Sequence, residues 1–224
     1  MNPQSKPAQA PALQITRRID LFDPPPPCRA VACDVLPPMN LSSNKTRHTE
    51  NLRLGRISEP GARYFLTWCT ARRGALLAVP AIQETAIQAI ASIDSSNDGS
   101  LLAASVMPDH IHILLELGER LTVSQLVGKT KSAVSRGNRE MKWQENFFEH
   151  RLRPNDLSEP FAFYIFMNPY CARVCQLERH WPGWVPSRAT RWEFEDKLSA
   201  DGLPQPEWIE QAEKFGAALP NGAE

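Results

Sequence analysis

The sequence lacks any apolar run of the roughly eighteen residues that a membrane span needs. Its first residues also lack the charged stretch, apolar stretch and small-residue cleavage site of a secretory signal, so we expect a cytoplasmic protein without a membrane partner. Excess charge is absent too, because 25 Lys and Arg balance 25 Asp and Glu. This balance excludes a basic coat over the whole surface, and any surface for nucleic acid must be local.

The sequence also lacks a CxxC pair or a dense cysteine framework. Its five cysteines, an odd number, lie far apart in three groups, at Cys28 and Cys33, at Cys69, and at Cys171 and Cys175. Neither a disulfide scaffold nor a zinc site of the usual spacing fits this distribution. We therefore expect reduced thiols.

Proline divides the chain. Nine of the 20 prolines fall before residue 41, including the run at residues 24–27, and this density predicts a disordered extension over residues 1–60. Residues 188–224 hold four basic and eight acidic side chains, which predicts a peripheral acidic tail with one short helix over residues 206–215. Such a tail could screen a basic surface elsewhere. The folded domain is expected between the two, over residues 61–187.

The domain shows alternating and helical periodicities in a recognisable order. Two apolar segments end and begin at the turn Pro108–Asp109 and predict a hairpin, and Thr122 is a suitable N-cap for the helix that follows. The predicted elements are a strand at 64–70, a helix at 79–93, strands at 101–106 and 110–117, a helix at 123–136 and a strand at 146–152. The order β-α-β-β-α-β predicts an α+β, ferredoxin-like (split βαβ) sandwich, an antiparallel sheet with helices on one face.

Two further helices are expected after this unit. Ser158, followed by an acidic residue and a proline, predicts a third helix that ends near Asn168. Pro169 disfavours the helical conformation at the residue before it, so we expect that helix to stop there and a fourth to begin afterwards.

His110 and His112 form the first candidate site. Side chains two apart on a strand point to the same face, so the two imidazoles lie side by side while Ile111 faces the other way. Two neutral imidazoles provide half of a divalent-metal site, and the turn before them places the pair at the start of an interior strand. The alternative is a pair of half-exposed strand histidines without a metal.

Tyr164 and Asn168 form the second candidate site. They are one helical turn apart, so the phenol and the carboxamide project from one face. A tyrosine is a poor nucleophile at its free pKa of about 10 and needs an activated electrophile, while the amide oxygen of Asn168 could complete the coordination begun by the histidines. The alternative is an ordinary core aromatic and a helix-end asparagine.

A basic stretch lies between the two sites. Residues 120–153 hold eight Lys and Arg against three Glu, and Trp143 and two phenylalanines are interleaved with them. Cations neutralise the phosphates of a single strand, and aromatic faces stack on its unpaired bases. We predict Trp143 for base contact and Lys129, Lys131, Arg136 and Arg151 for the backbone. The alternative is a solvated helix face with core aromatics.

Four separated motifs together resemble REP-associated tyrosine transposases, which are single-tyrosine HUH endonucleases of the insertion-sequence transposase type. The motifs are MPDHIHIL at 107–114, WQ with FFEHR over 143–151, YI with NP over 164–169, and WPGW with Ser187 over 181–187. The resemblance covers roughly residues 61–187. It implies that His110, His112 and the residue at the position of Asn168 bind Mg²⁺ or Mn²⁺, and that Tyr164 attacks a DNA phosphate.

Three features qualify the resemblance. The usual Pro-Asn-His is Pro-Asp-His here, and Asp109 could add a carboxylate behind the metal ligands. The usual Asn-Pro-Val-Arg-Ala-Gly is changed after Pro169, which alters the packing behind Asn168. His150 has a family counterpart without a role that we can argue, and we expect it to be a buried, hydrogen-bonded histidine.

The sequence therefore predicts a metal-dependent endonuclease and strand-transferase that acts on single-stranded, hairpin-forming repetitive DNA, as a monomer or homodimer. A 5′-phosphotyrosine intermediate keeps the energy of the cleaved bond, so no nucleotide cofactor is needed. Two alternatives remain. One is a domesticated protein that binds single-stranded nucleic acid without cutting it, and the other is a metal phosphodiesterase that uses water as its nucleophile.

Overall fold

The computed structural model describes residues 58–136 and 138–219. The extension predicted over residues 1–60 lies outside this part of the chain, apart from its last three residues. Within the described ranges, no helix has the length and apolar character that a membrane crossing requires. Of the five cysteines, Cys69, Cys171 and Cys175 are described, and all three are free thiols, as expected.

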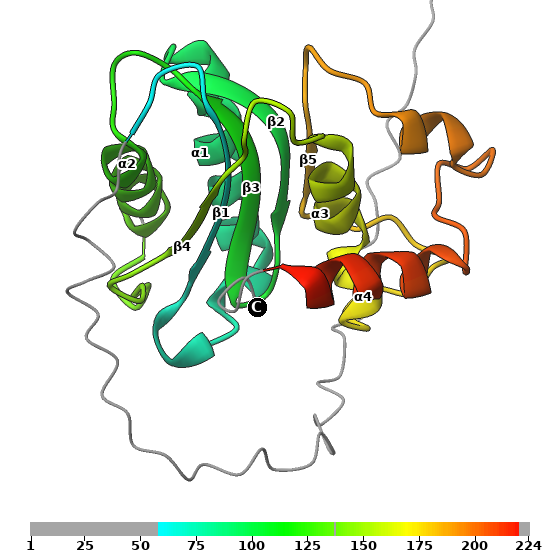
Figure 1. Cartoon of the computed structure of the whole chain (residues 1–224). Coiled ribbons are helices and arrows are strands. Elements are labelled where there is room, and N and C mark those ends of the chain that lie inside the picture. The colour runs from blue at the N-terminus through cyan, green and yellow to red at the C-terminus, as the bar shows by residue number, and fades with distance from the viewer. Residues whose placement is uncertain (1–57, 137, 220–224) are drawn as a thin grey trace, which may run out of the picture. The chain divides into compact units, whose positions relative to one another are not determined.

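A five-stranded antiparallel sheet forms the centre of the fold, in the order β4-β1-β3-β2-β5 (Figure 1). Its strands are β1 (Arg63–Cys69), β2 (Gly99–Val106), β3 (His110–Leu117), β4 (Phe148–Arg151) and β5 (Trp184–Pro186). The helices α1 (Pro80–Ser95) and α2 (Val123–Ser135) complete the β-α-β-β-α-β order, and two short 3-10 turns, Ala71–Arg73 and Leu76–Ala78, join β1 to α1. The predicted ferredoxin-like α+β fold is confirmed, with β5 as an additional strand beside β2.

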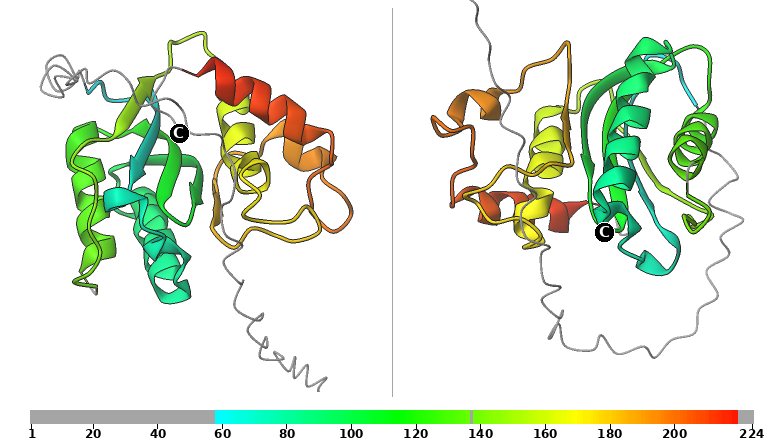
Figure 2. Two further views of the ribbon diagram at one scale, coloured as in Figure 1. Left: turned by 90° about the horizontal axis from the view of Figure 1, so that it is seen from below. Right: turned by 180° about the vertical axis from the view of Figure 1, so that it is seen from behind.

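The helices α1 and α2 cover one face of the sheet, as expected (Figures 1 and 2). Leu66 and Trp68 of β1 and Ile111 and Ile113 of β3 point to this face, because strand side chains alternate, and all four are fully buried. A capping box starts α2: the Thr122 hydroxyl accepts from the backbone N–H of Gln125, and the Gln125 side chain accepts from that of Thr122.

The opposite face of the sheet is covered as well, by α3 (Glu159–Cys171). Phe65 of β1 and Leu114 of β3 point to this face and belong to a second hydrophobic core with α3. Residues 161–167 are all buried, so α3 is apolar on every side and must itself be covered by another layer. This second layer is not part of the split βαβ pattern, and the periodicities did not predict it.

The prediction that the third helix stops before Pro169 is wrong. Helix α3 continues through Pro169 to Cys171, and no separate helix follows it before β5. A proline removes one hydrogen bond, which costs most in a helix interior, but here only two helical residues follow it. Pro169 is buried, and the N–H of Ala172 still donates to the carbonyl oxygen of Asn168 at 2.9 Å, so packing and the closing turn offset the lost bond.

The expectation of a peripheral acidic tail is also wrong for its described part, residues 188–219. A 3-10 helix, Glu193–Lys197, and α4 (Trp208–Ala218) bury Trp192, Phe194 and Trp208 in the second core. The predicted short helix is therefore present, two residues further along, but it packs against α3 (Figure 1). Because α2 lies on the other side of the sheet, this part of the tail does not screen the basic residues of α2.

Candidate active site

Both histidines lie at the start of β3, which is an interior strand between β1 and β2, as expected. Their side chains point to the α3 face, since Ile111 and Ile113 point to the other. His110 is 8% exposed and His112 is fully buried, so the alternative of two half-exposed strand histidines is wrong.

The two imidazoles meet through their Nε2 atoms, which are 3.0 Å apart, with the ring planes nearly perpendicular at 86°. The Nδ1 atom of each ring contacts an oxygen atom. Nδ1 of His110 lies 2.6 Å from Oδ1 of Asp109, and Nδ1 of His112 lies 2.8 Å from the hydroxyl oxygen of Thr67. When both Nδ1 atoms donate to these oxygens, both Nε2 lone pairs are directed toward one region of space.

Asp109 connects the histidines to a nearby arginine. Its second carboxylate oxygen lies 2.8 Å from Nε of Arg73. Burial alone raises the pKa of Asp109, but the hydrogen bond from His110 and the charges of His110 and Arg73 outweigh it and hold the pKa below its usual value. The carboxylate of Asp109 thus lies between the imidazole of His110 and the guanidinium of Arg73.

Arg73 and Thr67 were not predicted. Arg73 has a φ of 54°, a left-handed conformation that is uncommon for residues other than glycine, and this places its guanidinium beside Asp109. Thr67 faces His112 because the two residues are paired in the register of β1 and β3. A strand register depends on pairing between distant segments, so the local sequence contains no signal for either contact.

The electrostatics of His112 keep it neutral near neutral pH. Burial lowers its pKa well below the usual value, and the charges of His110 and Arg73 lower it further, while a hydrogen bond with the side chain of Asn168 raises it. A neutral imidazole retains the lone pair that a metal ion requires.

Helix α3 brings Asn168 and Tyr164 to the same place. The Asn168 side chain contacts His112 through the hydrogen bond just described, and the Tyr164 ring lies 5.6 Å from the His112 ring, centroid to centroid. The structure therefore collects His110, His112, Tyr164 and Asn168 at one position on the α3 face, although the sequence separates them by more than fifty residues.

Helix α4 covers the tyrosine. Tyr164 is 6% exposed, and the ring of Phe215 lies 6.0 Å from its own. Gly216 is so close that a Cβ atom there would be 2.8 Å from Cε2 of Tyr164. Access of a large substrate to Tyr164 therefore requires this end of α4 to move.

The residues predicted to bind DNA lie elsewhere. Lys129, Lys131 and Arg136 belong to α2 or to its C-terminal end, on the sheet face opposite to the histidines. Lys129 forms an ion pair with the buried Asp98, and Lys131 donates to the carbonyl oxygen of Gln144 at 2.8 Å, whereas Arg136 is exposed. Lys129 and Arg136 are both exposed, whereas Lys131 is partly buried.

Trp143 and Arg151 are also engaged in the fold. The indole N–H of Trp143 donates to the hydroxyl of Ser135 at 2.9 Å and to the carbonyl oxygen of Lys131 at 3.2 Å, and its ring is half-buried against the first core. Arg151, which is exposed, pairs with Glu59. His150 is half-buried and stacks on Phe161 at 5.5 Å, so the expected full burial is wrong.

The side chains at the histidine pair fit a divalent ion. Two nitrogens that bind one ion at right angles, each at about 2.1 Å, are about 3.0 Å apart. The Nε2 separation of His110 and His112 is 3.0 Å, and both rings are held from behind, as metal-binding imidazoles usually are. Among the described residues no group of three His, Cys, Asp or Glu side chains can hold a metal, so the third protein ligand of such a site must be another type, and Asn168 is adjacent.

Residues 59–152 match the model of a family described as IS200-like transposases. This match confirms the resemblance to transposases over that segment, which contains both histidines and ends before Tyr164 and Asn168. The chain is also similar to the solved structure of a REP-associated tyrosine transposase bound to a REP hairpin, with 24% identity, a TM-score of 0.49, and 58% of this chain and 79% of that chain covered.

A second solved structure, a candidate transposase of Deinococcus radiodurans, is 22% identical with a TM-score of 0.36, covering 41% of this chain and 79% of that one. With TM-scores below 0.5, neither structural likeness supports a statement about function. No curated protein matches the sequence closely enough to count as a relative.

Proposed function

We propose that the protein is a metal-dependent, single-strand DNA endonuclease and strand-transferase that uses Tyr164 as its nucleophile. The observation that supports this proposal is the convergence of two Nε2 atoms, the Asn168 amide and the Tyr164 ring on one sheet face, within a chain whose residues 59–152 match transposases. The proposed substrate is single-stranded DNA that folds into a hairpin. Mg²⁺ or Mn²⁺ is the proposed ion, since nitrogen and oxygen ligands suit both.

His110, His112 and Asn168 would hold the ion, which would act as a Lewis acid on a phosphodiester. Asp109 and Thr67 fix the orientation of the two imidazoles, so their Nε2 atoms stay directed at the metal site. Burial keeps His112 neutral and able to bind.

The Tyr164 oxygen would attack the phosphorus and lose its proton as the new O–P bond forms. The bond from phosphorus to the 3′-oxygen breaks, and that oxygen takes up a proton to leave a free 3′-hydroxyl. The product is a 5′-phosphotyrosine. Attack by a different 3′-hydroxyl reverses the step and joins new strands, so no nucleotide cofactor takes part.

The test is incubation with a labelled pool of single-stranded hairpin oligonucleotides and Mn²⁺, followed by a denaturing gel and intact-mass measurement. We expect a covalent protein–DNA species that disappears in Tyr164→Phe. Cleavage without an adduct that survives in Tyr164→Phe would support the water-using phosphodiesterase. Tight binding without cleavage under any divalent ion would support the domesticated binder.

A further inference from the structure

The helix that carries Tyr164 has no solvent-facing side to orient it. Residues 161–167 of α3 are all buried, so buried side chains project from the helix in every direction. Hydrophobic contacts have no preferred direction, and they do not by themselves fix the rotation of such a helix about its axis. A slip of one residue rotates a helix by about 100° and shifts it by about 1.5 Å, which would turn Tyr164 away from His112. Directional contacts must therefore fix the position of α3.

Arg63, the first residue of β1, provides such contacts where α3 begins. Its Nη1 donates to the hydroxyl oxygen of Ser158 at 2.6 Å. Its Nη2 donates to the carbonyl oxygens of Asp156 at 2.9 Å and Pro154 at 3.3 Å. All three acceptors belong to the segment that joins β4 to α3. One guanidinium therefore holds this segment at three points, up to the residue before the helix.

Ser158 shows that this contact is not ordinary helix capping. It occupies the N-cap position of α3, where a serine hydroxyl usually accepts from a backbone N–H of the first turn. Here the side chain makes no such bond, and its buried hydroxyl accepts from Arg63 instead. The helix dipole also disfavours a cation beside the N-terminus of a helix. Helix stability alone would not select this arrangement, which points to a role in placing α3.

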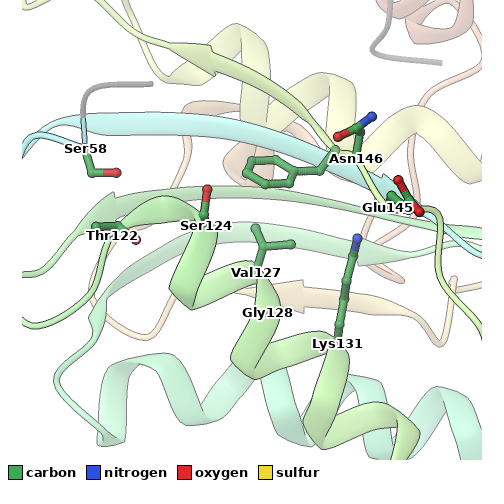
Figure 3. Close-up of a pocket in the computed structure, with 9 residues that line it drawn as sticks. Ser58, Thr122, Ser124, Val127, Gly128, Lys131, Glu145 and Asn146 are labelled. Atoms are coloured by element: carbon green, nitrogen blue, oxygen red, sulfur yellow. The ribbon is translucent and has the colours of Figure 1, made fainter. Parts of the chain in front are cut away.

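The backbone of Arg63 is fixed in the sheet. Arg63 is paired with Glu116 of β3, and its carbonyl oxygen accepts from the N–H of Leu152 at 2.9 Å. The chain before it is held as well, because the Ser58 hydroxyl accepts from the N–H of Val123 at 3.0 Å. Figure 3 shows Ser58 beside the start of α2. The guanidinium thus ties the start of α3 to a fixed strand.

We infer that Arg63 is a positioning residue for the proposed reaction and sets the place of Tyr164 and Asn168 relative to the histidines. Strand β1 carries both Arg63 and Thr67, and Thr67 contacts His112. The same strand therefore holds one imidazole of the proposed metal site and the start of the helix that bears the nucleophile. The inference rests on the proposed function in one respect, that Tyr164 is taken as the nucleophile.

The first test needs neither metal nor DNA. NMR of the full chain should detect nuclear Overhauser contacts between the rings of Tyr164 and His112, whose centroids are 5.6 Å apart. We expect Arg63→Gln, which lacks the forked donors, to weaken these contacts strongly. Ser158→Ala removes one acceptor without removing a capping bond, so it should weaken them less, and it decides the question if Arg63→Gln does not fold. Ring contacts that stay unchanged would overturn the inference.

The matched control is Arg153→Gln. Arg153 is an exposed arginine of the same segment, and its side chain makes no hydrogen bond within residues 58–136 and 138–219. This variant should keep the ring contacts of the unaltered chain. Arg63→Lys retains the charge but not the planar fork of donors, so the ring contacts should be weakened there too. Full recovery in Arg63→Lys would mean that charge alone matters, which contradicts the inference.

The second test measures the proposed reaction, well below the melting temperature of each variant. With saturating hairpin oligonucleotide and excess Mn²⁺, Arg63→Gln should form the Tyr164 adduct roughly 100-fold more slowly, since a displacement of about 1 Å at the reacting atoms has an effect of this size. Its affinity for the oligonucleotide should not change, because the guanidinium is engaged within the protein. A lower affinity with an unchanged rate would identify Arg63 as a DNA contact and overturn the inference.

The inference and the proposed function fail separately in these tests. Weakened ring contacts in Arg63→Gln, with no adduct even from the unaltered chain, would support the role of Arg63 in placing α3 while the proposed function fails. An adduct that forms as fast in Arg63→Gln as in the unaltered chain would overturn the inference while the proposed function stands.

Discussion

At the scale of single residues, Asp109 is the position at which this chain departs from the usual Pro-Asn-His motif. The structure shows what the change adds: a carboxylate that contacts Nδ1 of His110 with one oxygen and Nε of Arg73 with the other. An asparagine can offer only one oxygen and no negative charge. The orientation of His110 therefore depends on Asp109, which Arg73 contacts in turn.

We expect Asp109→Asn to weaken Mn²⁺ binding by roughly 10-fold to 100-fold, the usual effect of losing a partner behind a metal-binding histidine. Isothermal titration of the full chain with Mn²⁺ measures the change. Asp201→Asn, at an exposed position, is the matched control and should bind Mn²⁺ normally. An unchanged affinity in Asp109→Asn would show that Asp109 does not support the metal site.

Two glycines in helices allow a second prediction for single residues, which concerns stability. Alanine is favoured over glycine in a helix by about 1 kcal/mol, so the propensity gain is alike at Gly128 and Gly216. A Cβ atom meets nothing within 4 Å at Gly128 but lies 2.8 Å from Cε2 of Tyr164 at Gly216. We expect Gly128→Ala to raise the free energy of unfolding and Gly216→Ala to lower it or to loosen α4.

Chemical denaturation gives the two stabilities, and hydrogen exchange of the α4 amides shows whether that helix has moved from α3. Equal stabilisation by both substitutions would mean that α4 does not rest on Tyr164.

At the scale of elements, α3 does most to define the site. It is buried on all sides, and it places Tyr164 and Asn168 beside His112. Its last turn is partly buried, which has an effect at high pH. Burial raises the pKa of Tyr170 to about 12 and that of Cys171 to about 11, against 10.0 and 9.0 for exposed groups.

These shifts predict a loss of stability in alkali. Between about pH 9 and pH 11 the unfolded chain releases the Cys171 proton while the folded chain retains it, so the free energy of unfolding falls as the pH rises through this window. Tyr170 continues the fall between about pH 10 and pH 12. We expect Cys171→Ala to show a smaller decrease than the unaltered chain when denaturation is measured at pH 8.5 and pH 10.5.

The control for this experiment is Cys175→Ala, since Cys175 also carries a thiol near the end of α3. A decrease as large in Cys171→Ala as in the unaltered chain would contradict the role assigned to Cys171.

At the scale of the whole molecule, the sheet separates two sets of functional candidates. The histidines and Tyr164 lie on the α3 face, and the basic residues of α2 lie on the other. Binding and chemistry should therefore respond to different substitutions. Among the α2 cations, Lys129 and Arg136 are both exposed, and Lys129 pairs with the buried Asp98.

We expect Arg136→Gln to weaken binding of a single-stranded hairpin oligonucleotide and to lower the slope of log K against log salt by about 0.7, the value for one phosphate contact on a single strand. The rate of adduct formation at saturating DNA should not change. Fluorescence anisotropy over a series of salt concentrations measures the slope. Lys129→Gln is the comparison, and it should lower stability more than affinity because it leaves Asp98 without its cation.

The fold could be predicted largely from periodicity. The strand at residues 110–117 was located to the residue, and the capping box at Thr122 was located by its N-cap, because both signals are local. The predicted end of the third helix before Pro169 was wrong because that signal is local as well. A local rule against helix before proline does not include the packing that keeps Pro169 and Asn168 in α3.

The second hydrophobic core could not be predicted in this way. Trp192 and Trp208 lie in a segment whose acidic composition predicted a peripheral tail, yet both are buried against residues far away in sequence. Composition averages over a segment, whereas burial depends on which individual side chains meet an uncovered surface. Helix α3 offered such a surface, because it is apolar on every side.

The sequence by itself determined the local chemistry of this protein: two imidazoles on one face of a strand, and a phenol and an amide one turn apart on a helix. These follow from spacing alone, because strand and helix periods are fixed. Only the tertiary structure decided that the four side chains meet, that Thr67 contacts His112 and Arg73 contacts Asp109, and that the basic residues of α2 lie on the opposite face. Strand register and helix packing join residues far apart in the chain, so no local pattern specifies them.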